Sequence, residues 1–173
     1  MEDKNKYLET IRSDMFLNGL MMSYDQACNS AGGRLVLDYG CGYGWGSYLL
    51  SGSARQVMGY DLDRTRIQFA RGMFAKRNLT FLTDVIYLPA GSFEMVCLFL
   101  VLPWAENPLQ VLDQAGNCLV PGGELWLSFK SGDNRLTETA VAWAAGRKAE
   151  FLRVGCRRVT DAVYLNELIL KIG

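Results

Sequence analysis

The residues best suited to chemistry lie between positions 35 and 46. An apolar run, Leu35-Val36-Leu37, predicts a buried strand, and the acid Asp38 follows it directly. Glycines then occur at positions 40, 42, 44 and 46, ahead of a second apolar segment at 48–50. Glycine has no side chain and tolerates a positive φ, so a strand that leads through such a loop into a helix brings bare backbone close to a ligand. We therefore interpret this segment as a ligand-binding loop.

The acid beside the loop indicates which kind of ligand it accepts. A phosphate-binding loop needs a Lys and then Ser or Thr after its glycines, and no Lys follows here. The dinucleotide pattern G-x-G-x-x-G fails in three registers, because Trp45, Ser47 and Leu49 stand where its last glycine would be. A carboxylate would repel a pyrophosphate and attract a cationic group. The remaining alternative is a structural turn in which Asp38 caps the helix, but four glycines are costly in backbone entropy for a turn alone.

A second acid, Asp61, ends the strand-like segment Val57-Met58-Gly59-Tyr60. It lies 23 residues beyond Asp38, close to the spacing of about 20 residues at which the next strand of a βαβ unit delivers an acid to a ribose. A carboxylate can accept hydrogen bonds from both hydroxyls of a ribose. We therefore predict that Asp61 binds a ribose; the alternative is a helix cap.

These motifs resemble those of class I S-adenosylmethionine-dependent methyltransferases. Residues 38–44 match the pattern D-x-G-C-G-x-G, and segments similar to strands two to five of the family follow in order up to about residue 130. Among them is Leu119-Val120-Pro121-Gly122-Gly123, which matches the turn L-x-P-G-G into strand five. The resemblance implies S-adenosylmethionine as the cofactor. It also implies the cofactor-binding residues, which are Asp38, Gly40, Cys41, Gly42, Gly44, Asp61, Leu62, Asp84, Val85 and Phe99.

The resemblance also gives these residues expected roles. The glycines would lie along the methionine portion, and Asp38 would hold its amino group directly or through water. Leu62 would pack on the adenine, and Asp84 would accept from the adenine amine with Val85 beside it. Phe99, or its neighbour Leu100, would form the wall next to the methionine. For Asp84 the alternative is a turn carboxylate.

The residues that would activate an acceptor are less evident. Tyr39 replaces the small aliphatic residue usual in the family, and Pro103-Trp104 follows strand four, where many relatives carry a His or an acid. A sulfonium donor is already activated, so the protein mainly aligns two reactants and excludes water. The chain has no histidine, and no catalytic residue is assigned. The candidate bases are Glu106 and Asp133, and the candidate pocket aromatics, which could equally be core residues, are Trp104, Tyr24 and Phe16.

Composition narrows the class of protein. The 173 residues are 50% hydrophobic without an apolar run near 18 residues, so a single domain (1–173) without a membrane span is expected. Lys+Arg and Asp+Glu balance at 18 each, which argues against nucleic-acid binding. The chain has five cysteines without a C-x-x-C pair, and its first residues lack the profile of a signal peptide. Both features predict a reducing compartment, the cytoplasm. A chain without histidine is not expected to bind a metal.

The hydrophobic pattern predicts alternating helices and strands. One or two helices over residues 4–30 form a cap (1–30) on a core (34–173). The expected strands after the first are 56–60, 79–82, 93–100 and 124–129, and the expected helices are 47–51, 64–76 and 108 to about 120. Residues 136–154 are expected to be largely helical, interrupted at Gly146, and strands 157–163 and 167–172 to pair around a turn at 164–166. Such alternation implies a parallel sheet with helices on both faces.

Pattern and resemblance together predict a three-layer Rossmann-like α/β fold. Its sheet would be mostly parallel with an antiparallel C-terminal strand, in the order 3-2-1-4-5-7-6. The predicted activity is transfer of a methyl group from S-adenosylmethionine to a small-molecule acceptor by in-line displacement. Leu102-Pro103-Trp104 differs from the sequence [DNS]-P-P-[YF], which disfavours adenine or glutamine as the target. Two alternatives are a non-catalytic S-adenosylmethionine-binding partner subunit and a nicotinamide-dependent reductase.

Overall fold

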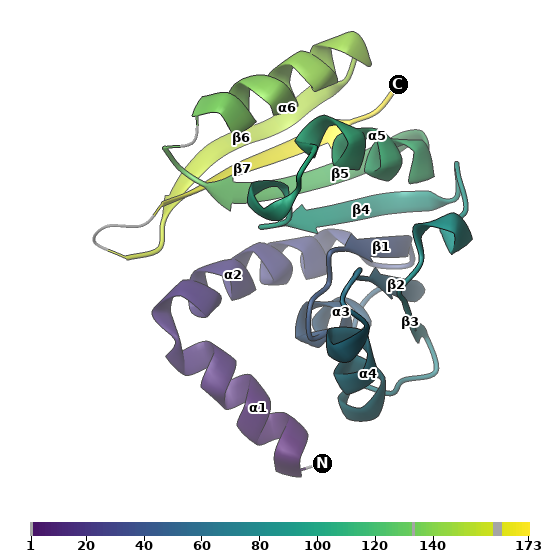
Figure 1. Cartoon of the computed structure of the whole chain (residues 1–173), viewed down its shortest axis with the longest axis vertical. Coiled ribbons are helices and arrows are strands. Elements are labelled where there is room, and N and C mark those ends of the chain that lie inside the picture. Colours follow the sequence, from purple (N-terminus) through teal and green to yellow (C-terminus); the bar gives the residue numbers. More distant parts are fainter. Residues whose placement is uncertain (1, 133, 161–163) are drawn as a thin grey trace.

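The computed structural model describes residues 2–132, 134–160 and 164–173. Its strands form one seven-stranded sheet in the order β3-β2-β1-β4-β5-β7-β6 (Figure 1). β1 to β5 run parallel, and β7 pairs antiparallel with both β5 and β6. This is the predicted sheet order, including its antiparallel end. The strands are β1 (Leu35–Tyr39), β2 (Gln56–Tyr60), β3 (Leu79–Leu82), β4 (Phe93–Phe99), β5 (Leu119–Lys130), β6 (Glu150–Arg158) and β7 (Tyr164–Lys171).

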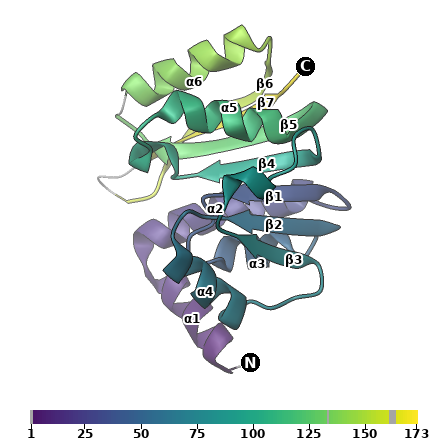
Figure 2. The ribbon, with the colours of Figure 1, turned by 45° about the vertical axis from the view of Figure 1, so that its right-hand side comes forward.

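Helices cover both faces of the sheet, as predicted (Figure 1 and Figure 2). One face packs against α1 (Glu2–Ser13), α2 (Met15–Ser30), α3 (Trp45–Leu50) and α4 (Arg64–Met73), and the other against α5 (Pro108–Cys118) and α6 (Asn134–Gly146). Successive residues of a strand alternate between the two cores: in β4, Met95 and Cys97 lie on the α2 side, and Val96 and Leu98 on the α5 side. Burial on both faces explains why the central strands are continuous apolar runs.

Two polar caps fix the helices that begin near the carboxyl edge of the sheet. Asp63 precedes α4 and accepts from the backbone N–H groups of Thr65 and Arg66. Asn107 precedes α5, accepts from the backbone N–H of Gln110 at 3.1 Å, and is followed by Pro108 at the first helical position. Asp and Asn are among the residues preferred at this position of a helix. The two caps set where the first turns of α4 and α5 lie relative to the strand ends.

The C-terminal part differs from the expected pattern. α6 ends at Gly146, and residues 150–158 form the edge strand β6, so the expectation of a helix as far as Val154 is wrong. Lys148 adopts a φ of 51°, which turns the chain out of the helix. The prediction of a turn at 164–166 is also wrong, because these residues pair with β6 and β5 at the start of β7. Pairing with neighbouring strands therefore determined the conformation of both segments, against the conformation that their local sequence pattern suggested.

Smaller differences concern the ends of elements. α4 ends at Met73 rather than at residue 76, and β5 begins at Leu119, five residues before the expected start at Glu124. Two short 3-10 helices were not predicted, η1 (Val85–Tyr87) after β3 and η2 (Leu102–Trp104) after β4. Both lie directly after strand ends. They shape the loops at the carboxyl edge of the sheet, where strand order reverses between β1 and β4 and open α/β sheets bind their ligands.

Candidate functional site

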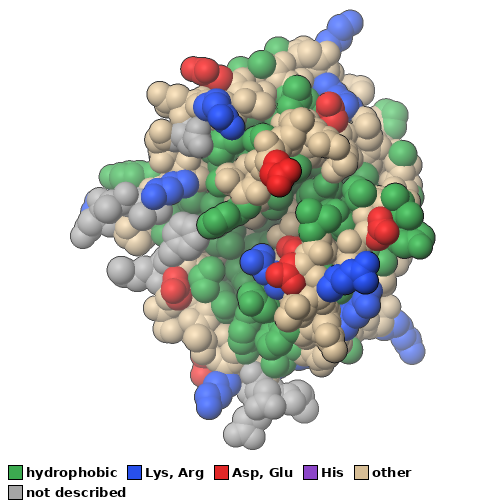
Figure 3. Space-filling model, in the orientation of Figure 1, with side chains coloured by type: hydrophobic (Ala, Val, Ile, Leu, Met, Phe, Trp, Pro, Cys, Tyr) green, Lys and Arg blue, Asp and Glu red, His purple; other side chains and the backbone are tan. Residues whose placement is uncertain are grey.

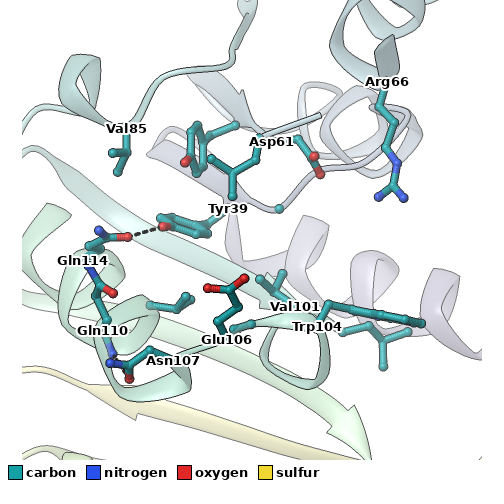
Figure 4. Close-up of a pocket in the computed structure, with 16 residues that line it drawn as sticks. Tyr39, Asp61, Arg66, Val85, Val101, Trp104, Glu106, Asn107, Gln110 and Gln114 are labelled. Atoms are coloured by element: carbon teal, nitrogen blue, oxygen red, sulfur yellow. Dashed lines mark hydrogen bonds between the residues drawn. The ribbon is translucent and has the colours of Figure 1, made fainter. Parts of the chain in front are cut away.

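A pocket of about 830 Å³ opens at the carboxyl ends of the central strands (Figure 4). Its size is near the upper end of the roughly 300–1,000 Å³ of ligand-binding clefts. Residues after β1, β2 and β3 form one wall, and η2 with the start of α5 forms the other. Four of the ten predicted cofactor residues line it: Gly40, Asp61, Leu62 and Val85.

Asp61 is the best-positioned of these residues. Its side chain is almost fully buried, at 9% exposure, and it lines the pocket. Oδ2 accepts from the backbone N–H of Gly42 at 2.8 Å, and Oδ1 accepts from the backbone N–H of Asp63 at 2.9 Å. These two bonds fix the carboxylate between β2 and the glycine loop. A carboxylate has about four acceptor sites, so each oxygen can accept one further hydrogen bond from a ligand.

The glycine loop is tied to the end of β2. The backbone N–H groups of Gly40 and Cys41 both donate to the carbonyl oxygen of Tyr60, at 2.7 and 2.9 Å. Gly42 has a φ of 55°, and a Cβ built on it would meet no atom of the described residues within 4 Å. Its backbone therefore borders open space.

The other three glycines of the loop are close-packed. A Cβ on Gly40 would collide with Val101, and one on Gly46 would collide with the ring of Tyr24. A Cβ on Gly44 would lie 2.6 Å from Ala70 and 2.8 Å from Phe81. Packing therefore explains Gly44 and Gly46, whereas Gly42 is the position in the loop where a missing side chain leaves room for a ligand.

Asp38 lies beneath the loop instead of in the pocket wall. It is 1% exposed, Oδ1 accepts from the Tyr24 hydroxyl at 3.0 Å, and Oδ2 accepts from the Ser47 hydroxyl at 2.6 Å. Burial raises the pKa of the Asp38 carboxyl from 3.8 to about 6, against the opposing effect of these two hydrogen bonds. The carboxylate thus connects α2, β1 and α3, and any effect on a ligand would act through the loop.

This burial predicts a pH-dependent effect of Asp38→Asn. The pKa is higher in the folded than in the unfolded chain, so the stability that Asp38 contributes is present below about pH 4 and lost as the pH rises through 6. An Asn can still bond both hydroxyls and never ionises. We expect the variant to gain stability over the wild type between pH 4 and 7, by on the order of 2–3 kcal/mol. Urea unfolding at a series of pH values measures this gain, and a difference independent of pH would contradict it.

The remaining predicted residues lie around the pocket but do not line it. Asp84 caps η1 by accepting from the backbone N–H of Ile86 at 3.1 Å, the role of a turn carboxylate. Phe99 packs on the α2 side of the sheet, edge-on to Tyr24 with ring centroids 4.8 Å apart. Cys41 is buried in the same core. Leu100, the alternative to Phe99, does line the pocket.

Two tyrosines that line the pocket, Tyr39 and Tyr60, were not among the predicted site residues. Tyr39 and Tyr60 meet edge to face with ring centroids 4.8 Å apart, and the Tyr39 hydroxyl donates to Gln114 Oε1 at 2.6 Å (Figure 4). Gln110 and Gln114, four residues apart on α5, line the same side. The sequence did contain an indication of this, because Tyr39, directly after Asp38, replaces the small aliphatic residue that is usual in the family.

The candidate acceptor residues have different positions. Trp104 lines the pocket and is 87% exposed, whereas Tyr24 is a buried core residue under the loop. Glu106 also lines the pocket, with its carboxylate directed into it (Figure 4). Asp133 and the side chain of Phe16 lie outside the described part of the chain.

The surface around this region carries mixed charge. On the face shown in Figure 3, acidic and basic side chains are interspersed with hydrophobic ones, and the described residues of that face form no continuous basic area. Within residues 2–132, 134–160 and 164–173, no helix has the length and apolar character to cross a membrane.

Comparison with known proteins identifies the family. A family model described as a methyltransferase domain matches residues 37–127, more than half of the chain. The chain therefore belongs to this methyltransferase family. The matched segment runs from β1 through the glycine loop to β5, so it contains the strands whose ends form the pocket.

Three curated relatives are similar over most of the chain. A probable S-adenosylmethionine-dependent methyltransferase of Mycolicibacterium smegmatis is 29% identical over 87% of this chain and 55% of its own length. A ubiquinone biosynthesis O-methyltransferase of Xanthomonas axonopodis is 30% identical over 65% of this chain and 49% of its length. A tRNA U34 carboxymethyltransferase of Alteromonas mediterranea is 33% identical over 79% of this chain and 44% of its length. The chain spans about half the length of these relatives.

Solved structures share the fold. The N-methyltransferase NodS of Bradyrhizobium japonicum, in complex with S-adenosyl-L-homocysteine, superposes with a TM-score of 0.76 at 15% identity, over 93% of this chain and 90% of NodS. The Rossmann-like fold predicted from the sequence is thus that of an S-adenosylmethionine-dependent methyltransferase.

Proposed function

We propose that this chain transfers the methyl group of S-adenosylmethionine to a small-molecule acceptor by in-line displacement. The observation that carries the proposal is Asp61, a carboxylate anchored to the glycine loop with acceptor capacity left at the pocket. Family membership and the relatives' names agree with it. An acid at this position suits a ribose and not a phosphate, as the sequence already indicated.

The described residues fit this cofactor. Asp61 would accept from the ribose hydroxyls, Leu62 and Val85 would pack on the adenine, and the open backbone at Gly42 would border the methionine portion. When bound, the cofactor supplies a methyl group on a positively charged sulfur, which needs no further activation. The protein's part is then to orient the acceptor and keep water out of the pocket. Asp38, buried beneath the loop, would add negative charge near the cationic ligand.

The nature of the acceptor is part of the proposal. The pocket is large enough for a cofactor and a small second molecule, and one relative takes part in ubiquinone biosynthesis. Another relative acts on tRNA, so the absence of a nucleic-acid partner stays a prediction that a gel shift with RNA tests. Five free cysteines support a reducing compartment, and we propose the cytoplasm.

Isothermal titration calorimetry of the purified chain tests cofactor binding. We expect S-adenosylmethionine and S-adenosylhomocysteine to bind in the range of typical substrate constants, about 1 μM–1 mM, and NADH to give no binding heat. NADH binding in place of both sulfur compounds would contradict the proposal and favour the reductase alternative. Release of S-adenosylhomocysteine by the purified chain with any acceptor would exclude the non-catalytic subunit.

A further inference from the structure

Trp104 is exposed to an unusual degree for a tryptophan in a pocket wall. Its exposure is 87%, while the other three tryptophans of the chain, Trp45, Trp126 and Trp143, are 6–7% exposed. The short helix η2 is held by Leu102, which is buried, and by the bond from the backbone N–H of Trp104 to the carbonyl oxygen of Val101 at 3.0 Å. The indole ring therefore contributes little to the fold. A buried aromatic side chain removes about 150–250 Å² from water, and a ring stacked on one face of Trp104 would bury part of that surface.

Arg66 supplies a positive charge to the same pocket. Its Nε pairs with Asp63, the residue that caps α4, at 3.2 Å, and both side chains are exposed. The guanidinium also lies over the ring of Tyr43, with its Cζ atom 5.7 Å from the ring centroid. Exposed contacts of these two kinds contribute about 1 kcal/mol or less each, so the guanidinium can turn toward an incoming anion.

The two side chains lie toward one end of the pocket. Figure 4 shows Trp104 and Arg66 on opposite walls at this end, Val85 and Gln114 at the other end, and Asp61 between them. If the cofactor occupies the positions proposed above, its adenine lies toward Val85. Its ribose lies at Asp61, so the sulfur lies beyond the ribose as seen from Val85, and we place the acceptor at the end with Trp104 and Arg66.

We propose that the acceptor is a planar aromatic molecule with an anionic substituent, its ring packed on Trp104 and its negative charge facing Arg66. This inference rests on the proposed function, because it needs the cofactor at the Val85 end. An indole face favours a flat ring by stacking, and a guanidinium fork matches the two oxygens of a carboxylate. Trp104 and Arg66 would then determine which acceptors bind.

Three matched probes separate the effects of ring and charge. They are 4-hydroxybenzoate, its neutral analogue 4-hydroxybenzamide, and cyclohexanecarboxylate, which has the charge without the aromatic ring. Each is titrated into the full chain saturated with S-adenosylhomocysteine, and tryptophan emission is followed. Because Trp104 alone is exposed among the four tryptophans, a ring that covers it shifts the emission of that residue. We expect 4-hydroxybenzoate to bind roughly fivefold tighter than the amide, and the cyclohexane acid to bind weakest.

Variants assign the binding to the two residues. Trp104→Phe should abolish the emission change but keep binding by calorimetry, whereas Trp104→Ala should weaken binding roughly tenfold. Arg66→Gln should remove the preference for the carboxylate. The matched controls are Arg64→Gln, an exposed arginine on the same helix turn, and Leu109→Ala, an exposed apolar residue on α5; neither residue lines the pocket. Both controls should behave as the wild type.

The outcomes distinguish this inference from the proposed function. Failure of S-adenosylhomocysteine to bind would count against the proposed function itself. If it binds, and none of the probes then binds or changes the Trp104 emission, the inference is overturned. It is also overturned if the amide and the carboxylate bind equally well, or if the control variants lose as much affinity as Arg66→Gln and Trp104→Ala.

Discussion

Asp61→Ala is expected to weaken the binding of S-adenosylmethionine and S-adenosylhomocysteine by at least a hundredfold. The substitution removes two charge-assisted hydrogen bonds to the ribose, each contributing about 1.5–3 kcal/mol. It also releases the backbone N–H of Gly42, which Asp61 now holds at 2.8 Å. Calorimetry with S-adenosylhomocysteine measures the loss. Retention of wild-type affinity would show that Asp61 is only a loop anchor.

Asp63→Ala is the matched control for this substitution. Asp63 lies two residues further on, caps α4 and does not line the pocket. Its loss should lower the free energy of unfolding by about 1 kcal/mol, the usual contribution of a helix cap, with little change in cofactor affinity. Loss of stability with retained binding in Asp63→Ala, set against loss of binding in Asp61→Ala, would separate the two roles.

Gly42→Val is expected to abolish cofactor binding without unfolding the chain. A Cβ at this position enters open space and meets no atom of the described residues within 4 Å, so we expect the folded protein to accommodate the substitution. The same side chain would occupy the space proposed for the methionine portion. The positive φ of 55° adds strain, which we expect to lower the free energy of unfolding by about 1–2 kcal/mol. Thermal unfolding and calorimetry on one sample measure both effects.

Gly91→Val controls for the strain alone. Gly91 has a φ of 57°, and a Cβ built on it, like one on Gly42, would have no atom of residues 2–132, 134–160 and 164–173 within 4 Å. It lies two residues before the first residue of β4, at the end of that strand away from the pocket. The two variants should lose similar stability, and only Gly42→Val should lose binding. Equal loss of affinity in both would indicate that backbone strain, and not occupation of the pocket, is responsible.

The central part of the fold was predictable because its signals are local. Buried strands such as β1 and β4 are continuous apolar runs, and Asp63 and Asn107 with Pro108 mark the helix starts. The resemblance supplied the sheet order. β6 was not predictable in the same way, since an edge strand with exposed residues has no strong pattern, and its conformation depends on pairing with β7.

The sequence predicted what kind of site this is, but not where each of its residues lies. Spacing identified Asp61, which the structure places in the pocket wall. The spacing of residues could not show that Asp38 is buried and bonded to Tyr24 and Ser47. Tyr24 lies on a helix that precedes the first strand, and no local sequence pattern relates that helix to the loop. Nor could spacing show that Gly44 and Gly46 are packing positions, since a missing side chain has the same sequence signature whether a ligand or a neighbouring ring fills the space.

The contact between Tyr24 and the glycine loop has a consequence for shortened forms of the protein. The Tyr24 ring lies against Gly46 and Trp45, and its hydroxyl bonds Asp38. Deleting residues 1–30 would therefore remove Tyr24 and expose the apolar surface of the loop, together with the Asp38 carboxyl group, to solvent. This exposed surface would lie directly beneath the loop for which we propose cofactor binding. The helix α2, which carries Tyr24, therefore supports the glycine loop from below. A shortened form of the protein that is to stay active has to retain it.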